Sequence, residues 1–415
     1  MSRNKLYSIL LLGTLLLIYI SSFVDRQIIA VLATGIREEL GLNNTQVGVL
    51  YGPAFSLIYA VCGLVMGYLA DRYSRKYIIL SGLTIWSMMT LLSGFATSFA
   101  FLISARLMVG VSQSALSPAV YSLLADYFGP EKRARVFSVY ASGIFIGVGL
   151  SFLIGGSVAE AFDWRTAIKS VGWPGLILAV LGLLVIREPK RDTDFGSLQA
   201  SLKGYRRGFS KLVSKPVVRF HLAGFSLLAL SGYTILAFIS TVLTDVYNRG
   251  DLISYYGWFM MATALSVNVS GWLADRLALK FGGKGRFGMG VVAALGGLPF
   301  YILGFTTEDG FTAFLWIGLG NVISSSYNGV AAALIQYFVG SDMRATAGAL
   351  YLFVVSVVGF GIGPPLTGWL IDHVFTGAFG PNYALLSVFG VCGALATLCF
   401  VGGMRAYDDG IKIKD

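Results

Sequence analysis

The chain has 415 residues, of which 56% are apolar and only 13% are charged, and its mean hydropathy is +0.74. Soluble domains carry about 45–50% apolar and about 25% charged residues, so this composition excludes an ordinary soluble enzyme or nucleic-acid-binding protein. The net charge of +10 needs another explanation, which the positions of the basic residues supply. The three cysteines, Cys62, Cys392 and Cys399, lie in apolar runs, which indicates packed side chains rather than a disulfide or metal site.

Membrane-spanning helices account for the apolar residues, because a bilayer core of about 30 Å needs roughly 20 apolar residues per helix. We predict twelve such spans. The first six are expected at 7–32, 45–70, 77–97, 100–127, 135–159 and 164–187. The second six are expected at 219–244, 253–274, 287–305, 311–339, 345–371 and 381–404.

Three local patterns refine these spans. The first span is too long for a removable signal peptide. Asn43-Asn44-Thr45 is typical of a helix cap and predicts the start of span 2. In span 11, Gly361-Ile362-Gly363-Pro364-Pro365 predicts a kinked or broken helix.

The basic residues predict the orientation, since cytoplasmic loops collect Lys and Arg. With the N-terminus inside, all but six of the 31 basic residues fall on the cytoplasmic side. The six exceptions are Arg26, Arg37, Arg106, Arg165, Lys169 and Arg249. Both termini are therefore predicted to be cytoplasmic, and the compact loops without targeting signals favour a bacterial inner membrane.

A central polar stretch at 188–218 divides the chain into an N-terminal bundle of six helices at 1–187 and a C-terminal bundle of six at 219–404. A cytoplasmic tail occupies 405–415. Apolar residues in the central stretch recur at three- and four-residue steps among many basic ones, which predicts an amphipathic helix on the cytoplasmic leaflet. A solvated linker is the other interpretation.

The two halves repeat each other. Gly67-Tyr-Leu-Ala-Asp-Arg-Tyr-Ser-Arg-Lys76 after span 2 matches Gly271-Trp-Leu-Ala-Asp-Arg-Leu-Ala-Leu-Lys280 after span 8 at Gly, Leu, Ala, Asp, Arg and the last Lys. Glycines of span 5 recur in span 11 at a similar offset. An internal duplication around a central site is the architecture of secondary transporters.

Asp25 and Arg26 in span 1 and Arg106 in span 4 are the clearest charged residues inside predicted spans. Such charges cost roughly 2.5–3.5 kcal/mol each on insertion scales and therefore usually pair or line a watery cavity. We expect Asp25 to contact Arg106. An anionic group binding to Arg106 would free Asp25 and favour its protonation, which would couple substrate to proton; a static buried ion pair is the alternative.

Aromatic and weakly polar side chains are candidates for the rest of the cavity, although packing and interfacial anchoring are common roles for such residues in membranes. The candidates are Tyr51, Phe55, Tyr59, Tyr121, Tyr140, Tyr233, Trp258, Asn321, Ser325, Asn328 and Tyr351. Few hydrogen-bonding groups among apolar walls favour an amphiphile over a sugar.

The Gly67–Lys76 loop, the repeat and the number of spans resemble the major facilitator superfamily over essentially the whole chain. The resemblance implies an all-α integral membrane protein of twelve transmembrane helices in two pseudo-symmetric bundles. It also implies a cytoplasmic latch in which Asp126 is the partner of Arg75; a topology anchor is the alternative. The residues assigned to the latch are Gly67, Asp71, Arg72, Arg75, Lys76, Asp126, Asp275 and Arg276.

Within that superfamily, Asp25-Arg26, Arg106-Leu-Met-Val-Gly110 and Asp163-Trp-Arg165 are similar to segments of the Spinster branch, and also to the anion:cation symporter branch. Spinster proteins carry R-x-x-x-G-x-x-E in span 4, where this chain has Gln113 in place of the glutamate. A glutamine does not bind and release a proton near neutral pH. Proton coupling at this position is therefore in question, and Gln113 either leaves that role to Asp25 or imitates a protonated acid.

The resemblance implies a secondary transporter working by alternating access, coupled to protons and moving an amphipathic or lipid-like anion. A proton-coupled organic-anion symporter or multidrug exporter is the alternative, and a non-transporting receptor a further one. No nucleotide-binding loop is present, and with His221 and His373 as the only histidines we expect no enzyme activity and no cofactor. The expected partners are a small substrate and membrane lipids, without nucleic acid, for a monomeric protein.

Overall fold

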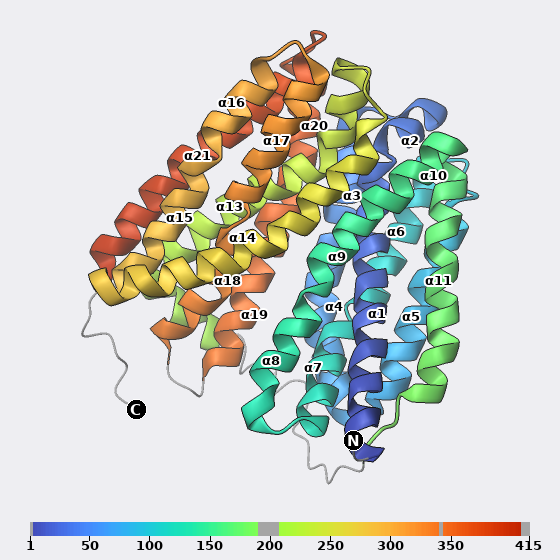
Figure 1. Cartoon of the computed structure of the whole chain (residues 1–415), viewed down its shortest axis with the longest axis vertical. Coiled ribbons are helices and arrows are strands. Elements are labelled where there is room, and N and C mark those ends of the chain that lie inside the picture. Colours follow the sequence, from blue (N-terminus) through green and yellow to red (C-terminus); the bar gives the residue numbers. More distant parts are fainter. Residues whose placement is uncertain (1–2, 190–206, 340–342, 408–415) are drawn as a thin grey trace. The chain divides into compact units, whose positions relative to one another are not determined.

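The computed structural model describes residues 3–189, 207–339 and 343–407 (Figure 1). Regular structure in these ranges is helical, and none of these residues lies in a strand. The chain forms two compact units. Unit 1 comprises Met1–Leu42 and Ala54–Ser201, and unit 2 comprises Asn43–Pro53 and Leu202–Asp415.

Unit 1 contains long helices that pack along their lengths (Figure 1). Its elements are α1 (Arg3–Val31), α2 (Ala33–Leu40), α4 (Pro53–Arg72), α5 (Arg75–Ser93), α6 (Phe99–Gln113), α7 (Leu116–Tyr127), α8 (Pro130–Ala141), α9 (Gly143–Leu150), η1 (Ser151–Gly156), α10 (Ser157–Ala161) and α11 (Trp164–Val185). Helix α1 packs against α9 and α11, and α5 packs against α6 and α11.

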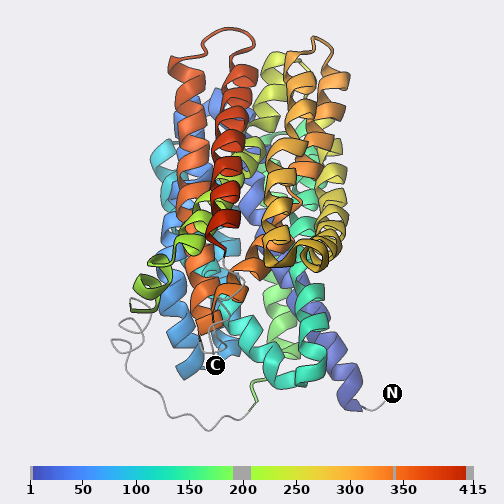
Figure 2. The same ribbon diagram turned by 90° about the vertical axis from the view of Figure 1, so that its left-hand side faces the viewer.

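Unit 2 contains α3 (Asn44–Tyr51), although this helix precedes α4 in the chain. Its other elements are α13 (Pro216–Thr241), η2 (Val242–Val246), α14 (Leu252–Phe281), η3 (Gly282–Lys284), α15 (Gly285–Gly296), α16 (Leu298–Thr306), α17 (Gly310–Ser324), α18 (Tyr327–Leu334), η4 (Ile335–Phe338), α19 (Arg344–Val354), η6 (Val355–Phe360), α20 (Gly361–His373) and α21 (Gly380–Ala406). Helix α13 packs on α20 and α21, and α3 packs on α20. Figure 2 turns the orange and red helices of unit 2 toward the viewer.

Side-chain caps start several helices where the sequence places a short polar residue. The Asn43 side chain accepts from Gln46 N at the start of α3, which confirms the predicted cap of span 2. Asp163 accepts from Thr166 N at the start of α11, and Asp309 caps α17 in the same way. These bonds satisfy backbone N–H groups that a helix start leaves free.

Ten helical runs in the described residues have the length and hydropathy of membrane spans. Twelve spans were predicted, and two of them do not appear as separate runs. The run Leu252–Thr306 combines spans 8 and 9, because the chain turns at Gly282, with φ 69°, without losing helical continuity. Span 10 corresponds to α17 and α18, which are not among the ten runs. The protein is therefore a multi-pass, all-helical membrane protein.

Irregular turns occur in several spans, and two of them bear directly on the sequence predictions. The predicted span 45–70 divides at Gly52 and Pro53 into α3 and α4, a break that our sequence analysis missed. In span 11 the expected break takes the form of the π-helical turn η6, and α20 then continues through Pro364 and Pro365. Prolines lack an N–H and leave carbonyls of the preceding turn without their helical donor, which favours such an irregular turn.

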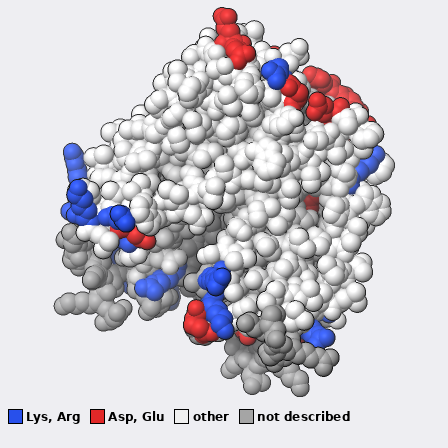
Figure 3. All heavy atoms as spheres, in the orientation of Figure 1, with Lys and Arg blue, Asp and Glu red and all other residues white. Residues whose placement is uncertain are grey.

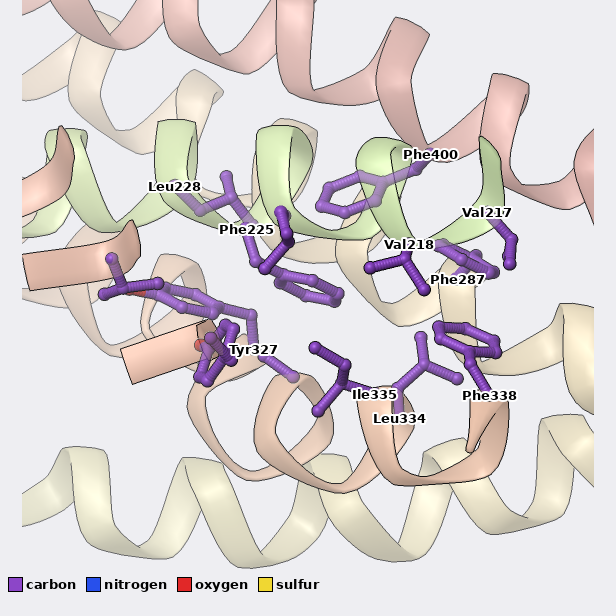
Figure 4. Close-up of a cluster of buried hydrophobic side chains, with 14 of the residues drawn as sticks. Val217, Val218, Phe225, Leu228, Phe287, Tyr327, Leu334, Ile335, Phe338 and Phe400 are labelled. Carbon is purple, nitrogen blue, oxygen red and sulfur yellow. The ribbon is translucent and has the colours of Figure 1, made fainter. Parts of the chain in front are cut away.

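The core of unit 2 is a large apolar cluster between α13, α15, α18, η4 and α21 (Figure 4). His221 lies among its rings, with centroids 4.8 Å from Phe225 and 5.8 Å from Phe338. Phe209 and Leu212 of the helical residues 207–213 also pack on this cluster, so this end of the central stretch faces protein rather than lipid. Residues 190–206 of the central stretch 188–218, for which the amphipathic helix is predicted, lie outside the described residues, as do the tail residues 408–415.

The outer surfaces of the helices are apolar. Figure 3 shows few charged side chains on the visible face, most of which is uncharged. On α11, for example, Ile177, Val180 and Leu184 are largely exposed. Exposed apolar stripes of this kind are expected where lipid, rather than water, surrounds a helix.

Candidate functional site

A cluster of buried polar groups joins α1 to α6 inside unit 1. Arg106 of α6 donates from Nη1 to the backbone carbonyl of Asp25 at 3.1 Å and from Nη2 to that of Arg26 at 2.8 Å. Asp25, Arg106 and Gln113 are all buried. The predicted contact between positions 25 and 106 is present, but it runs through the main chain of Asp25 and not through its carboxylate.

The Asp25 carboxylate faces α5. Its side chain is fully buried, and the nearest donors are the Thr90 hydroxyl and the Trp86 indole N–H. Neither carboxylate oxygen makes a hydrogen bond of ordinary geometry with the described residues. A buried carboxyl group without a hydrogen bond is costly unless it is protonated or finds a partner. Our sequence analysis missed Trp86 and Thr90, which carry no charge and look like ordinary packing residues.

Arg26 lies in an aromatic box. Its guanidinium carbon is 4.5 Å from the ring centroid of Phe23, 4.5 Å from that of Phe55 and 4.8 Å from that of Tyr59. Rings at these distances stabilise a cation through their negative faces. Two predicted cavity residues, Phe55 and Tyr59, are thus brought to the predicted charges. Phe23 adds a third ring that the sequence did not single out.

Gln113 connects Arg26 to the backbone of α1. Its Oε1 accepts from Arg26 Nη2 at 3.4 Å, and its Nε2 donates to the carbonyl of Ser22 at 3.2 Å. The amide therefore uses both its acceptor and its donor. An ionised glutamate would keep the first interaction but could not donate to Ser22.

Two further predicted tyrosines of unit 1 form an aromatic group at α8. Tyr140 is fully buried and stacks on Tyr19, with centroids 4.1 Å apart. Tyr121 meets Tyr140 edge-on at 5.4 Å and Phe137 at 5.0 Å. These contacts are typical of packing, so the two side chains act here as parts of a helix interface.

The predicted cavity residues of unit 2 lie in separate places. Tyr51 contacts Phe360, which stacks on Tyr233 at 4.4 Å. Tyr351 packs beside His221. Asn321 and Ser325 line a small cavity of about 20 Å³, which Tyr301 also lines. Asn328 is exposed, and its amide donates to the Ser325 carbonyl. Trp258 lines an apolar groove of about 490 Å³ between α14 and α17.

The end of unit 1 where α4 leads into α5 contains the predicted contact between Arg75 and Asp126. The two side chains form an ion pair of 2.6 Å, and Arg75 Nε also meets Glu188 Oε1 at 2.9 Å. Glu188 in addition accepts from the hydroxyl of Ser74 and the backbone N–H of Lys76. We missed Glu188, although an acidic residue directly after span 6, beside many basic ones, was a usable signal.

The other predicted latch residues are less connected. Gly67 faces Pro118, and Asp71 and Arg72 are exposed, with Arg72 over the ring of Tyr68. In the second half, Asp275 pairs with Arg286 at 3.2 Å, and Arg276 lies over Trp272.

The second loop does not reproduce the pairing of the first, and the sequence shows why. Leu279 stands where the repeat places Arg75. Its side chain is 89% exposed. Without a guanidinium at this position, the second loop lacks the group that organises the first.

A polar contact fixes the other end of unit 1. Glu39 of α2 accepts from Trp164 Nε1 at 2.6 Å and from the Arg165 guanidinium at 2.7 Å. These hydrogen bonds, that of Arg165 foremost, hold the pKa of Glu39 below its ordinary value. Arg165 also donates to the carbonyl of Ala96. Two of the six basic residues outside the predicted cytoplasmic side, Arg165 and Lys169, thus lie at this end of α11.

Multiple helical spans, two helical units and buried charges within the spans are typical of a membrane transporter. The sequence pattern of the Major Facilitator Superfamily matches residues 15–360, and the chain belongs to this family. Its members are transporters rather than enzymes.

Three known proteins illustrate the likeness. An "MFS-type efflux pump" of Mycolicibacterium smegmatis is 31% identical over 395 residues, which cover 94% of this chain and 90% of that protein. "Protein spinster homolog 1" of Mus musculus is 25% identical over 433 residues, covering 97% and 82%. The solved structure of a bacterial homolog of the human lysosomal transporter Spinster, inward-facing and unoccupied, has a TM-score of 0.84 at 24% identity, covering 97% of this chain and 99% of that one. The chain thus resembles the Spinster branch.

Proposed function

We propose that the protein is a proton-coupled secondary transporter that moves an amphipathic anion by alternating access in a bacterial inner membrane, as a monomer with both termini in the cytoplasm. The observation that carries this proposal is the Asp25 carboxylate, which is fully buried, makes no hydrogen bond of ordinary geometry with the described residues, and lies on the same turn of α1 as Arg26. When a carboxyl group in this position binds or releases a proton, it changes the net charge of a buried site.

The charges of the site favour an anionic substrate. Arg26 and Arg106 together exceed Asp25 by one positive charge, and protonation of Asp25 raises the excess to two. Proton binding and anion binding therefore support each other, which is the thermodynamic requirement for coupling. Arg106 is engaged with two backbone carbonyls, so Arg26, which is half-buried, is the more accessible cation.

The aromatic box favours an amphipathic molecule over a small hydrophilic anion. Phe23, Phe55 and Tyr59 surround Arg26 with apolar surface. An anionic head group would meet the guanidinium while its apolar part lies on the rings. Lysolipids, which combine an anionic head group with an apolar chain, are the first class to test.

The test is transport into proteoliposomes with and without a pH gradient, for a panel of lysolipids, carboxylates and cationic drugs. We expect a pH gradient to drive transport of an amphipathic anion, and Asp25→Asn to abolish that dependence. Glu160→Gln, which neutralises an exposed carboxylate of unit 1, is the matched control. Full pH-driven transport by Asp25→Asn would refute proton coupling at this site.

The alternatives give different results in the same assay. A multidrug exporter of this family would favour the cationic drugs, and an organic-anion symporter would accept small carboxylates as well as lysolipids. A receptor would bind a ligand without flux. The cost of keeping two guanidinium groups and a carboxylate within the spans favours transport over a receptor.

A further inference from the structure

Helix α3 belongs to unit 2 although the chain on both sides of it belongs to unit 1. The segment Asn43–Pro53 packs with unit 2, whereas Leu42 before it and Ala54 after it are parts of unit 1. Its main contact is α20. A short helix that is covalently connected to one unit and packed in the other can change its packing when the conformation changes.

The N-terminus of α3 is held by one carboxylate of α20. Asp372 Oδ1 accepts from the backbone N–H of Asn44 at 3.1 Å and from its side-chain amide at 2.8 Å. Asp372 Oδ2 accepts from the backbone N–H of Thr45 at 2.8 Å and from its hydroxyl at 2.7 Å. Four hydrogen bonds to a single carboxylate combine charge assistance with the favourable position of an anion at a helix N-terminus.

Together with the capping box, these bonds give every free backbone N–H group at the start of α3 an acceptor. The N–H of Asn43 donates to Gln46 Oε1, and the N–H of Gln46 donates to Asn43 Oδ1. With Asn44 and Thr45 bonded to Asp372, all four N–H groups that a helix start leaves free have partners. The capping box is internal to α3, so of these four backbone N–H groups only those of Asn44 and Thr45 lose their partner when α3 and α20 separate.

Glycines allow the two helices to approach closely. A side-chain carbon at Gly48 would collide with the backbone of Pro364, and one at Gly52 with the carbonyl of Phe360. A carbon at Gly368 would collide with the backbone of Asn44. The face is therefore built for contact between backbones, as small residues allow in membranes, with Asp372 at one end of it.

We propose that the bonds from Asp372 to the N-terminus of α3 form a clasp that closes and opens once per transport cycle, and that Asp372 sets how long α3 stays on α20. This inference rests on the alternating-access function proposed above. Pro53 has no N–H, so no backbone bond from this residue ties α4 back to α3. The chain can bend at Gly52–Pro53 while α4 moves with unit 1.

The first experiment measures hydrogen–deuterium exchange of the full-length protein in nanodiscs, over the peptide 44–51. Asp372→Asn keeps the shape of the side chain but places an NH₂ against donors, and we expect at least about tenfold faster exchange in α3. Asp372→Ala should exchange faster still. Asp309→Asn is the matched control, because Asp309 also caps a unit 2 helix through a carboxylate, and it should leave α3 unchanged. Native protection of α3 in a folded Asp372→Ala protein would overturn the clasp.

The second experiment tests opening. Thr45 and Asp372 touch through their side chains, so Thr45→Cys with Asp372→Cys, in a background without the native cysteines, replaces the clasp by a disulfide. We expect oxidation to stop transport and reduction to restore it. Undiminished transport by the oxidised protein would overturn the proposed opening. If the native chain transports nothing, the proposed function fails, whereas the exchange result still judges the clasp itself.

Discussion

Replacing Gln113 by glutamate changes one atom group at the centre of the unit 1 site. The glutamine accepts from Arg26 and donates to the Ser22 carbonyl. A protonated glutamate reproduces both interactions, whereas an ionised one strengthens the first and turns the second into repulsion between two oxygens. The variant therefore introduces a titratable group whose two forms prefer different partners.

The distances give the size of the competing effects. With 3.4 Å between Arg26 Nη2 and the side-chain oxygen, and an effective dielectric constant of about 20, an ion pair contributes about 5 kcal/mol. Losing the bond to the Ser22 carbonyl costs about 1–3 kcal/mol, and removing a carboxylate from water costs several kcal/mol more. These terms nearly cancel, so we expect the two forms of Glu at this position to exchange within the working pH range.

The assay is uptake into proteoliposomes at a series of equal internal and external pH values, for native protein and Gln113→Glu. Transport by the variant should depend on pH through one additional ionisation, changing by up to about tenfold per pH unit beyond its midpoint. Gln113→Leu, which removes both interactions without adding a charge, should lower transport equally at every pH. Superimposable pH profiles for native protein and Gln113→Glu would refute this reasoning.

Three further predictions concern stability. Glu188→Ala leaves Arg75 with a single carboxylate partner and should reduce the unfolding free energy by about 1–3 kcal/mol, seen as a lower melting temperature; an unchanged midpoint would mean that Glu188 contributes little. Arg165 holds the pKa of Glu39 below its ordinary value of 4.5, so their contact stabilises the protein above that value and the stabilisation disappears as the pH falls through the lowered pKa. In Glu39→Gln the melting temperature should therefore decrease less as the pH is lowered below 4.5. An unchanged decrease would assign this acid sensitivity to another group. His221→Phe removes two buried nitrogens that have no hydrogen-bond partner among the described residues. It should raise the unfolding free energy by about 1 kcal/mol, which a decrease in melting temperature would contradict.

The sequence was most informative about charges. Asp25, Arg26 and Arg106 stand out because charged residues are costly inside apolar spans, and the structure brings all three together. The pairing of Arg75 with Asp126 followed from a family resemblance, and its ion pair is present. Spans were predictable for the same reason, since a long apolar run has few alternatives to a membrane helix.

The sequence did not predict the uncharged residues that lie next to the buried charges, or the position of the helix break in span 2. Trp86 and Thr90 gain their importance only from the carboxylate that faces them, and nothing in their own sequence neighbourhood marks this. The break at Gly52–Pro53 was missed because hydropathy averages over it. We expected Arg106 to contact the Asp25 carboxylate, but its guanidinium binds the backbone carbonyls of Asp25 and Arg26 instead. Residue types alone do not specify which of these partners an arginine selects.

The division of span 2 between two units has a consequence for biosynthesis. Asp372 follows Thr45 by 327 positions, so at a synthesis rate of about 5–20 residues per second roughly 16–65 s pass before α3 can meet its cap. During this interval the start of α3 has only its internal capping box, and its glycine face lacks a partner. The N-terminal half expressed alone should therefore insert with α3 incompletely packed, and co-expression of the C-terminal half should order it.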